Sequence, residues 1–300
     1  MDLEQKQITA NGLNFAYLQT AKTEKPIVLL HGFPETPHIF GELMQALAAE
    51  GYWCIAPFLR GYAPSSVPQN LQDNPNATIQ LADLCDDIFA ILDGLGIEDT
   101  YLLGHDWGSI ISYTVANKNS QRIKKLITIS IPPLSTILAN SLSFPKQWLR
   151  SWYIFFFQTR LHIPEFFVRW NNYSLLKKLY QDWSPDLAVS PNLLEDFCQS
   201  IAEHSHLNAT LAYYRGLLSP LPEEWDKWQE SRRLSMQKLA VPTLLLSGKN
   251  DGCMGSEMYK NVDRSFSRSS KHTMIASAGH FLLVEAPEKV YREVSEFLQN

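Results

Sequence analysis

The chain has 300 residues, of which 45% are hydrophobic and 19% are charged, so it can bury one large core. Its formal net charge of −5 gives no reason to expect a nucleic acid as partner. No apolar run approaches the roughly 20 residues that cross a bilayer, and residues 1–7 lack the basic flank and apolar stretch of a signal peptide. The composition therefore predicts a globular protein of the cytoplasm.

The first half of the chain alternates strands with helices. The expected strands are 13–19, 27–30, 53–56, 101–103 and 125–130, and the expected helices are 38–49, 78–92 and 109–116. Thr78 is expected to cap the second of these helices. Such alternation is typical of a mostly parallel sheet with helices on both faces, which is an α/β fold.

The alternation stops at Pro132-Pro133 and resumes with strands at 241–246 and 271–276 and a last helix from Pro287. Between Phe144 and Trp183 there are 13 aromatic residues, in helical stretches without a clear strand. We therefore predict a helical insert, or cap. Its expected bounds are 133–220, on a core formed by residues 1–132 and 221–300.

The four cysteines are scattered, without a Cys-x-x-Cys pair or the spacing of a metal site. This pattern predicts free thiols in a reducing compartment and no bound metal. Cys253 closely follows Asp251, and we expect its thiol to be partly exposed. The other three are Cys54, Cys85 and Cys198.

Asp106 stands where a nucleophilic serine is expected. A short apolar strand from Tyr101 ends in the turn Gly104-His105-Asp106-Trp107-Gly108, and a helix follows. This is the strand, elbow and helix of the Gly-x-Ser-x-Gly motif with a carboxylate in place of the serine. An aspartate is ionised at neutral pH and displaces a leaving group from a saturated carbon, whereas a serine must first lose a proton. The product is an ester on Asp106, which predicts a hydrolase of epoxides or alkyl halides.

Hydrolysis of that ester needs a base, and histidine is the usual choice near neutral pH. Of eight histidines, His280 lies just after a predicted strand, where a loop can reach the elbow. The loop after the preceding strand carries Asp251 within 248–252, which predicts this carboxylate as the acid that orients the base. An ordinary turn role is the alternative for Asp251, but the chain order of nucleophile, acid and histidine favours catalysis.

The attack of water on the ester creates an oxyanion, which needs hydrogen-bond donors. The turn 31–34, with the sequence His-Gly-Phe-Pro, follows a predicted strand, and Trp107 directly follows the nucleophile. We expect the backbone N–H groups of Phe33 and Trp107 to form the oxyanion hole. Their side chains are expected to line the substrate pocket.

Together these motifs resemble those of the α/β-hydrolase superfamily, in the branch of epoxide hydrolases and haloalkane dehalogenases. The resemblance covers nearly the whole chain. It rests on His-Gly-Phe-Pro at 31–34, Gly-His-Asp-Trp-Gly at 104–108, Asp251, and Gly-His-Phe at 279–281. It implies the α/β-hydrolase fold with an inserted helical cap and a reaction without a cofactor.

The same resemblance implies two cap tyrosines that hydrogen-bond the epoxide oxygen and protonate it as the ring opens. The first lies in a motif like residues 151–158, which matches at Tyr153, and the second directly precedes an arginine, which matches Tyr214 before Arg215. A phenol with a pKa of about 10 supplies the proton that an alkoxide leaving group needs. Tyr213 is the alternative to Tyr214 if the motif is aligned one residue earlier. For either cap tyrosine, the alternative to catalysis is packing of the ring.

The resemblance leaves the leaving group open. Haloalkane dehalogenases use the same triad but need N–H groups for the halide, commonly from an asparagine after the His-Gly pair or from a second cap tryptophan. Phe33 stands where the asparagine would be, which disfavours a dehalogenase. The cap contains several tryptophans, so a second halide-binding tryptophan remains an alternative. The cap tryptophans are Trp148, Trp152, Trp170 and Trp183. A non-catalytic paralogue that binds a ligand in the same pocket is a third hypothesis.

The aromatic residues of the insert predict a lid with an apolar inner face. We expect Phe156 to line a pocket for a small, uncharged, hydrophobic substrate. A lid that also touches membranes is the weaker hypothesis, since the insert lacks a basic amphipathic pattern. The leading hypothesis is a cofactor-independent epoxide hydrolase that releases a vicinal diol, as a monomer or a homodimer.

Overall fold

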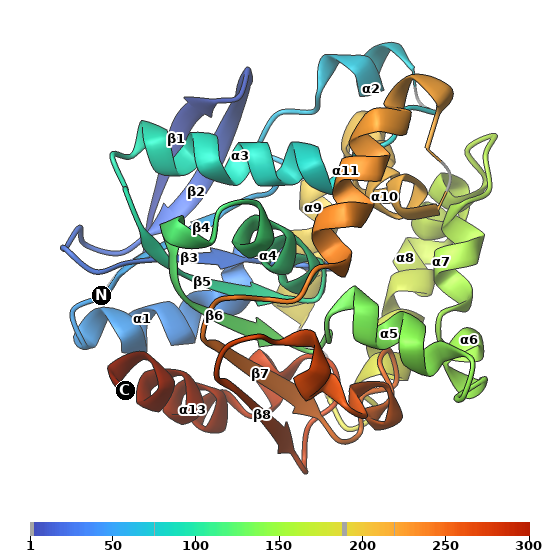
Figure 1. The fold of residues 1–300 in the computed structure, drawn as a ribbon. Helices are drawn as coiled ribbons and strands as arrows, with labels where there is room; N and C mark the ends of the chain where they lie inside the picture. The colour runs from blue at the N-terminus through green and yellow to red at the C-terminus, as the bar shows by residue number, and fades with distance from the viewer. Residues whose placement is uncertain (1–2, 75, 188–190, 219) are drawn as a thin grey trace.

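The computed structural model describes residues 3–74, 76–187, 191–218 and 220–300. Its strands are β1 (Glu4–Ala10), β2 (Leu13–Gln19), β3 (Pro26–Leu30), β4 (Trp53–Pro57), β5 (Thr100–His105), β6 (Ile123–Ile129), β7 (Thr243–Gly248) and β8 (Ser270–Ile275). They form one sheet in the order β1-β2-β4-β3-β5-β6-β7-β8 (Figure 1). The β1–β2 and β2–β4 pairs are antiparallel, and every pair from β4 to β8 is parallel. The mostly parallel sheet expected from the alternating sequence is confirmed.

The inner strands are short apolar runs covered on both faces, so they carry no polar alternation. Strands β3, β4 and β7 are buried along their whole length. The sequence does not predict β1, because Glu4, Gln5 and Lys6 make it polar; it is an edge strand whose first residues are exposed. Strand β8 at the other edge is also largely exposed, and polar edge strands discourage pairing with other chains.

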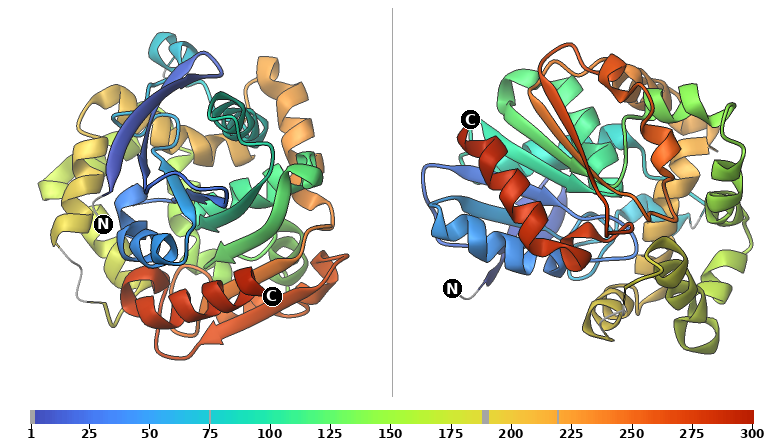
Figure 2. Two further views of the ribbon diagram at one scale, coloured as in Figure 1. Left: turned by 90° about the vertical axis from the view of Figure 1, so that its left-hand side faces the viewer. Right: turned by 90° about the horizontal axis from the view of Figure 1, so that it is seen from below.

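Helices cover both faces of the sheet. On one face α1 (Gly41–Ala49) packs with α13 (Pro287–Gln299) (Figure 2). On the other face α3 (Leu81–Gly94), α4 (Trp107–Lys118) and α11 (Trp225–Met236) pack together. This two-sided cover gives the sheet the buried interior that the apolar strands require.

Helix α3 begins later than expected. Its N-cap is Gln80, whose backbone N–H donates to Asp83 Oδ2 at 3.3 Å. The predicted cap, Thr78, instead donates from its hydroxyl to Glu224 Oε2 at 2.5 Å and from its N–H to Glu224 Oε1 at 2.8 Å. Thr78 therefore ties the start of α3 to the start of α11, and a local sequence pattern cannot reveal a contact between residues 146 positions apart.

Between β6 and α11 the chain forms a series of helices. They are α5 (Leu134–Ser141), α6 (Lys146–Arg150), α7 (Trp152–Phe157), α8 (Ile163–Trp183), α9 (Pro191–Ser200) and α10 (His204–Leu218). Of these, α5, α6, α7 and α8 lie at the right of Figure 1, beyond one end of the sheet. No strand occurs among the described residues of this part of the chain. Helix α8 is interrupted from Trp170 to Tyr173, where Asn171 and Asn172 take left-handed backbone angles that asparagine tolerates.

Arg215 holds three of these helices together. Its buried side chain donates to Glu165 Oε1 on α8 at 2.8 Å, to Asn208 Oδ1 at 2.9 Å and to the carbonyl oxygen of Phe157 on α7 at 3.2 Å. The planar guanidinium provides this fork of donors, which a lysine ammonium does not. Because Arg215 follows Tyr214 on α10, it also fixes the position of that tyrosine relative to α7.

The outer surface of α6, α7 and α8 is rich in exposed aromatic side chains. They include Trp148, Phe155, Phe166, Phe167 and Trp170, with exposed fractions of 43% to 62%. Even so, no helix in the described part of the chain combines the length and apolarity that crossing a bilayer requires.

We predict that Gly108→Ala destabilises the fold by about 2–3 kcal/mol, because overpacking a tight contact forces the backbone to shift. A Cβ at Gly108 would lie 1.8 Å from the carbonyl oxygen of Leu30, where α4 crosses the end of β3. Gly41→Ala is the control, since its Cβ would meet only Leu3 Cδ1 at 3.9 Å and its φ of −50° is helical. Urea unfolding of both variants measures the difference, and equal midpoints would contradict the prediction.

Candidate active site

Asp106 lies at the sharp turn between β5 and α4. Its φ of +51° and ψ of −117° are unusual for a residue with a side chain, and such strain is often held at functional sites. The side chain is buried, with 4% of the residue exposed. The turn therefore directs a carboxylate to the end of the sheet, as the strand, elbow and helix motif predicts.

His280 lies between two carboxylates. Its Nδ1 donates to Asp251 Oδ2 at 3.0 Å, and its Nε2 lies 3.4 Å from Asp106 Oδ2. Asp251 is held in turn, because its Oδ1 accepts the N–H groups of Cys253 at 2.7 Å and Met254 at 2.8 Å. The structure thus brings the three predicted triad residues together, all of them buried.

The charge of this arrangement affects the protonation of His280. Burial disfavours the charged ring, but Asp251, Cys253 and Asp106 outweigh it, so the pKa of His280 lies well above its usual value. In the free protein the imidazolium is therefore the counterion of the two aspartates.

The turn after β3 directs the N–H of Phe33, one of the two expected oxyanion donors, at Asp106. The Phe33 N–H donates to Asp106 Oδ1 at 2.8 Å, and the Gly32 N–H donates to Glu35 Oε1 at 2.8 Å. A Cβ at Gly32 would lie 2.4 Å from Asp106 Cβ, which is why only glycine fits there. Trp107 opens α4, and the first N–H groups of a helix have no partner within the helix, so its N–H is the second candidate donor.

A hydrogen-bond network that the motifs do not reveal links the turn after β3 to the base. Glu35 Oε1 bonds His105 Nδ1 inside the elbow, and His105 Nε2 donates to the carbonyl oxygen of His280 at 2.9 Å. The network connects the oxyanion turn, the nucleophile's elbow and the loop of the base. Sequence reasoning missed it because Glu35 and His105 are 70 positions apart and neither lies in a position that suggests the other.

Tyr153 on α7 and Tyr214 on α10 meet beside the elbow. Their rings lie 5.9 Å apart, edge to face, and the Tyr214 ring lies 5.1 Å from the Trp107 ring. Burial raises the pKa of both hydroxyl groups well above the usual value, and the nearby charge of Asp106 adds to the shift. Both tyrosines therefore keep their protons at neutral pH.

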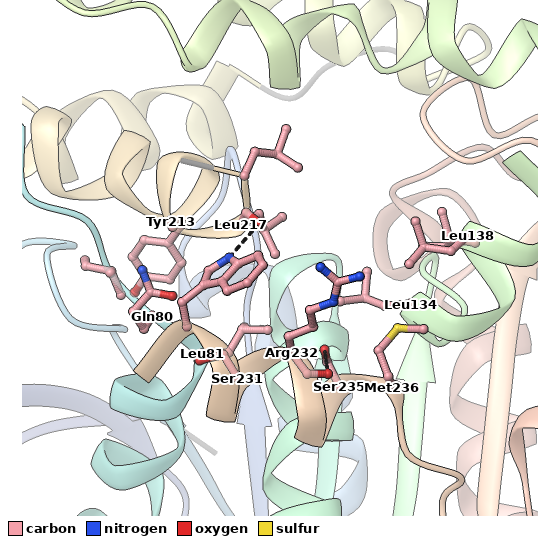
Figure 3. Close-up of a pocket in the computed structure, with 15 residues that line it drawn as sticks. Gln80, Leu81, Leu134, Leu138, Tyr213, Leu217, Ser231, Arg232, Ser235 and Met236 are labelled. Atoms are coloured by element: carbon pink, nitrogen blue, oxygen red, sulfur yellow. Dashed lines mark hydrogen bonds between the residues drawn. The ribbon is translucent and has the colours of Figure 1, made fainter. Parts of the chain in front are cut away.

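Tyr213, the alternative to Tyr214, has other contacts. Its hydroxyl donates to the carbonyl oxygen of Arg60 at 2.8 Å, and its ring lies 5.5 Å from that of Trp107. Tyr213 also lines a mostly apolar cavity of about 420 Å³ between α5, α10 and α11 (Figure 3). It therefore contacts both this cavity and the residue that follows the nucleophile.

Phe157 faces the site. Phe157 is fully buried, and its ring lies 5.0 Å from Tyr214 and 5.7 Å from Phe33. Phe156 is half-buried, with its ring 5.9 Å from that of Phe167, and it lines a separate hollow with Trp152 and Trp170. The pocket role of Phe156 stays a prediction, whereas Phe157 is the ring that contacts Tyr214 and Phe33. Neighbours on a helix point about 100° apart, and hydrophobicity does not give the phase of a six-residue aromatic helix.

Cys253 is buried, with 1% of the residue exposed, so the expected partial exposure is wrong. The turn after Asp251 folds back because that carboxylate accepts the Cys253 N–H, and the fold-back directs the side chain inward. The sulfur lies 3.3 Å from the Tyr153 hydroxyl, at hydrogen-bond distance. Burial raises the pKa of this thiol.

Trp183, at the end of α8, is a further residue of the site. Its ring lies 5.1 Å from that of His280 and 4.9 Å from that of Tyr153. Its carbonyl oxygen accepts the N–H groups of Gly252 at 3.0 Å and His280 at 3.1 Å. The end of α8 thus holds the two loops that carry the acid and the base, whereas the sequence distinguishes Trp183 only as one of several cap tryptophans.

The sheet order, the elbow and the order of the triad in the chain define the α/β-hydrolase class. A family model described as alpha/beta hydrolase fold matches residues 25–287. Epoxide hydrolase 4 of Homo sapiens is 30% identical over 299 residues, which cover 98% of this chain and 78% of the relative. The AB hydrolase superfamily protein YfhM of Bacillus subtilis is 28% identical over 98% of this chain and 97% of its own.

Solved structures agree with the sequence relatives. A putative epoxide hydrolase from Klebsiella pneumoniae has a TM-score of 0.85 and 26% identity, over 99% of this chain and 98% of that one. The epoxide hydrolase of Bacillus megaterium, in complex with an inhibitor, has a TM-score of 0.82 and 25% identity, over 98% of this chain and 100% of that one. The chain therefore belongs to the α/β-hydrolase fold family, in its epoxide hydrolase branch.

We predict that His31 makes the fold sensitive to acid. Burial lowers the pKa of His31 to about 4, while its Nδ1 bonds the Gly32 carbonyl oxygen at 2.9 Å and its Nε2 accepts the Leu59 N–H at 3.2 Å. The unfolded chain binds this proton from about pH 6.5 downward and the folded protein only near pH 4. The unfolded state therefore binds more protons in this window, and the free energy of unfolding falls by about 3 kcal/mol as the pH drops through it.

Urea unfolding between pH 7 and pH 4 measures this effect. His31→Gln removes the titrating group, so we expect its free energy of unfolding to fall less steeply with acid than that of the wild type. Parallel curves for the two proteins would contradict the prediction.

Proposed function

We propose that this protein hydrolyses a hydrophobic epoxide to a vicinal diol through a covalent ester on Asp106. The observation that carries the proposal is the meeting of two buried, protonated tyrosines with a buried aspartate at an elbow. An aspartate nucleophile alone suits many leaving groups, but phenol groups beside it suit a leaving oxygen that needs a proton. The family membership supports the same reaction, since several relatives carry the name epoxide hydrolase.

In the first step, an oxygen of Asp106 attacks an epoxide carbon and the ring C–O bond breaks. The Phe33 N–H holds Oδ1, so Oδ2 is the oxygen free to attack. The released ring oxygen takes a proton from Tyr153 or Tyr214. The products are a hydroxyalkyl ester on Asp106 and a phenolate, which solvent reprotonates.

In the second step, His280 removes a proton from water, and the resulting hydroxide attacks the carbonyl carbon of the ester. Ester formation removes the negative charge of Asp106, which is one of the causes of the raised pKa of His280. The imidazolium can then lose its proton and act as a base, oriented by Asp251. The N–H groups of Phe33 and Trp107 stabilise the oxyanion. As it collapses, the leaving alkoxide takes a proton from His280 and departs as the diol, and the new carboxylic acid loses its proton to restore the carboxylate.

We further propose that residues 133–220 act as a cap over a core formed by residues 1–132 and 221–300. The triad comes from core loops, whereas Tyr153 and Tyr214 come from helices α7 and α10. The apolar rings around them suit a small, uncharged substrate. The scheme uses side chains and water and needs no cofactor. The four free thiols support a cytoplasmic location.

We predict that His280→Gln accumulates the ester on Asp106, because the first step proceeds while its hydrolysis lacks a base. Turnover of an epoxide should fall by at least about 1000-fold. Intact-protein mass spectrometry after exposure to a panel of epoxides and alkyl halides detects the adduct. An epoxide adds its whole mass, whereas an alkyl halide adds its mass less that of the hydrogen halide.

Asp106→Ala is the control for this experiment and should stay unmodified. Unmodified His280→Gln protein, after exposure to a substrate that the wild type converts, would overturn the covalent scheme. A halide-derived adduct without any epoxide-derived one would instead identify a haloalkane dehalogenase.

We predict that Tyr153→Phe and Tyr214→Phe each lower epoxide turnover by about 10-fold to 100-fold, and that the double variant loses more. The reason is that each variant removes one proton donor for the ring oxygen and retains the ring packing. Tyr213→Phe is a matched control, since its hydroxyl bonds the Arg60 carbonyl oxygen. Steady-state kinetics compare the three single variants. An equal loss of turnover in Tyr213→Phe would refute the assignment of Tyr153 and Tyr214 as the proton donors.

A further inference from the structure

Cys253 brings a sulfur atom next to the nucleophile and the base. A carboxylate oxygen of Asp106, the Cys253 sulfur and a ring nitrogen of His280 all lie within 4.8 Å of one another, and all three residues are buried. No other three His, Cys, Asp or Glu residues in the described ranges bring their ligand atoms this close together. The proposed reaction gives Cys253 no part, so its placement needs a separate account.

The spacing of two of these atoms already suits a metal ion. Zinc binds histidine nitrogen and carboxylate oxygen at about 2.1 Å, so two such ligands at a tetrahedral angle lie about 3.4 Å apart. His280 Nε2 and Asp106 Oδ2 are separated by 3.4 Å. A Zn–S bond is about 2.3 Å long, so the sulfur must approach by at most about 1 Å, a shift that we assign to rotation of the Cys253 side chain as the metal binds.

The outer hydrogen bonds also match those of a zinc site. A zinc-bound histidine usually donates its other ring N–H to a carboxylate, which fixes the ring and raises its basicity. His280 has this arrangement, since its Nδ1 donates to Asp251 Oδ2 at 3.0 Å. Its Nε2 is buried and makes no hydrogen bond of good geometry to the described residues. The atom that would bind a metal is therefore oriented, and its contact with Asp106 Oδ2 is the one that the metal would replace.

We propose that the active site binds a thiophilic divalent cation, with Zn²⁺ as the type, through Asp106, Cys253 and His280, and that the bound cation blocks the nucleophile. As the bonds form, the Cys253 thiol and the His280 imidazolium, the latter from Nε2, each give one proton to solvent. One carboxylate and one thiolate then balance the two positive charges, which suits a buried site. Magnesium and calcium prefer oxygen ligands and are not expected to compete.

Metal binding does not depend on the proposed reaction, whereas the inhibition rests on it. A cation held by Asp106 Oδ2 occupies the oxygen that attacks the substrate, and a cation on His280 Nε2 occupies the base. The cation would therefore prevent both steps reversibly, and a chelator would restore turnover.

Direct binding of Zn²⁺ and Co²⁺ to the full chain tests the site without any substrate. Isothermal titration should give one Zn²⁺ per chain, and Co²⁺ should give the near-ultraviolet absorption of a cobalt–thiolate bond. Cys253→Ala should weaken Zn²⁺ binding by at least about tenfold and abolish that absorption. Cys253→Ser is a second variant, which keeps a hydrogen-bonding group beside Tyr153 and should show the same loss.

Cys198→Ala is the matched control, because Cys198 is a partly buried cysteine on α9 outside the site, and it should bind Zn²⁺ like the wild type. Folded cysteine variants that bind Zn²⁺ as tightly as the wild type, or a wild type that binds none, would overturn the proposal. Inhibition of epoxide turnover by Zn²⁺ is measured for each variant relative to its own rate without metal. It should be strong in the wild type and in Cys198→Ala and weak in the Cys253 variants. If binding is found but no epoxide is converted, the metal site stands and the proposed function fails.

Discussion

The position of His280 between two buried aspartates is the constraint on which the site depends. Asp251 accepts from one ring nitrogen, and Asp106 lies 3.4 Å from the other. Two carboxylates buried together without a cation would repel each other and lose their hydration, which costs several kcal/mol. The charged ring removes most of this penalty. The ring is therefore the counterion of Asp106, and in the proposed second step the same ring must give up its charge to act as a base.

Three loops bring these groups together, and each loop follows the carboxyl end of a parallel strand. Open α/β sheets usually bind ligands at this end of their strands. Contacts between the loops fix their spacing. Glu35 and His105 join the oxyanion turn to the elbow, and the Trp183 carbonyl oxygen holds the loops of the acid and the base. Within the insert, a buried ion pair between Arg215 and Glu165 joins α10 to α8. The triad is thus held by the sheet, and the tyrosines by the packing of three helices.

The features that follow from local sequence were predictable, and those that depend on distant contacts or helix phase were not. The sheet could be predicted from the short apolar runs between helices. Each of the three triad residues follows a predicted strand, so the motifs alone place all three at the carboxyl ends of the strands. The edge strand β1 is too polar to recognise. The sequence does not single out Phe157 as the ring that contacts Tyr214, because hydrophobicity does not show which side of a short aromatic helix faces the site. Only a structure pairs Glu35 with His105 or turns Cys253 inward.

The site has a part in which substitutions are not tolerated, at the tight turns around Asp106, and a part in which they are tolerated. Any side chain at Gly32 or Gly108 would collide with atoms within 2.4 Å. The wall at Phe157, by contrast, consists of side-chain rings in contact with one another, with ring centres 5.0 Å to 5.9 Å apart. Natural or laboratory evolution of this scaffold is therefore expected to reach new substrates by exchanging aromatic residues on α7 and α10. Its reaction chemistry should be inherited unchanged by every descendant.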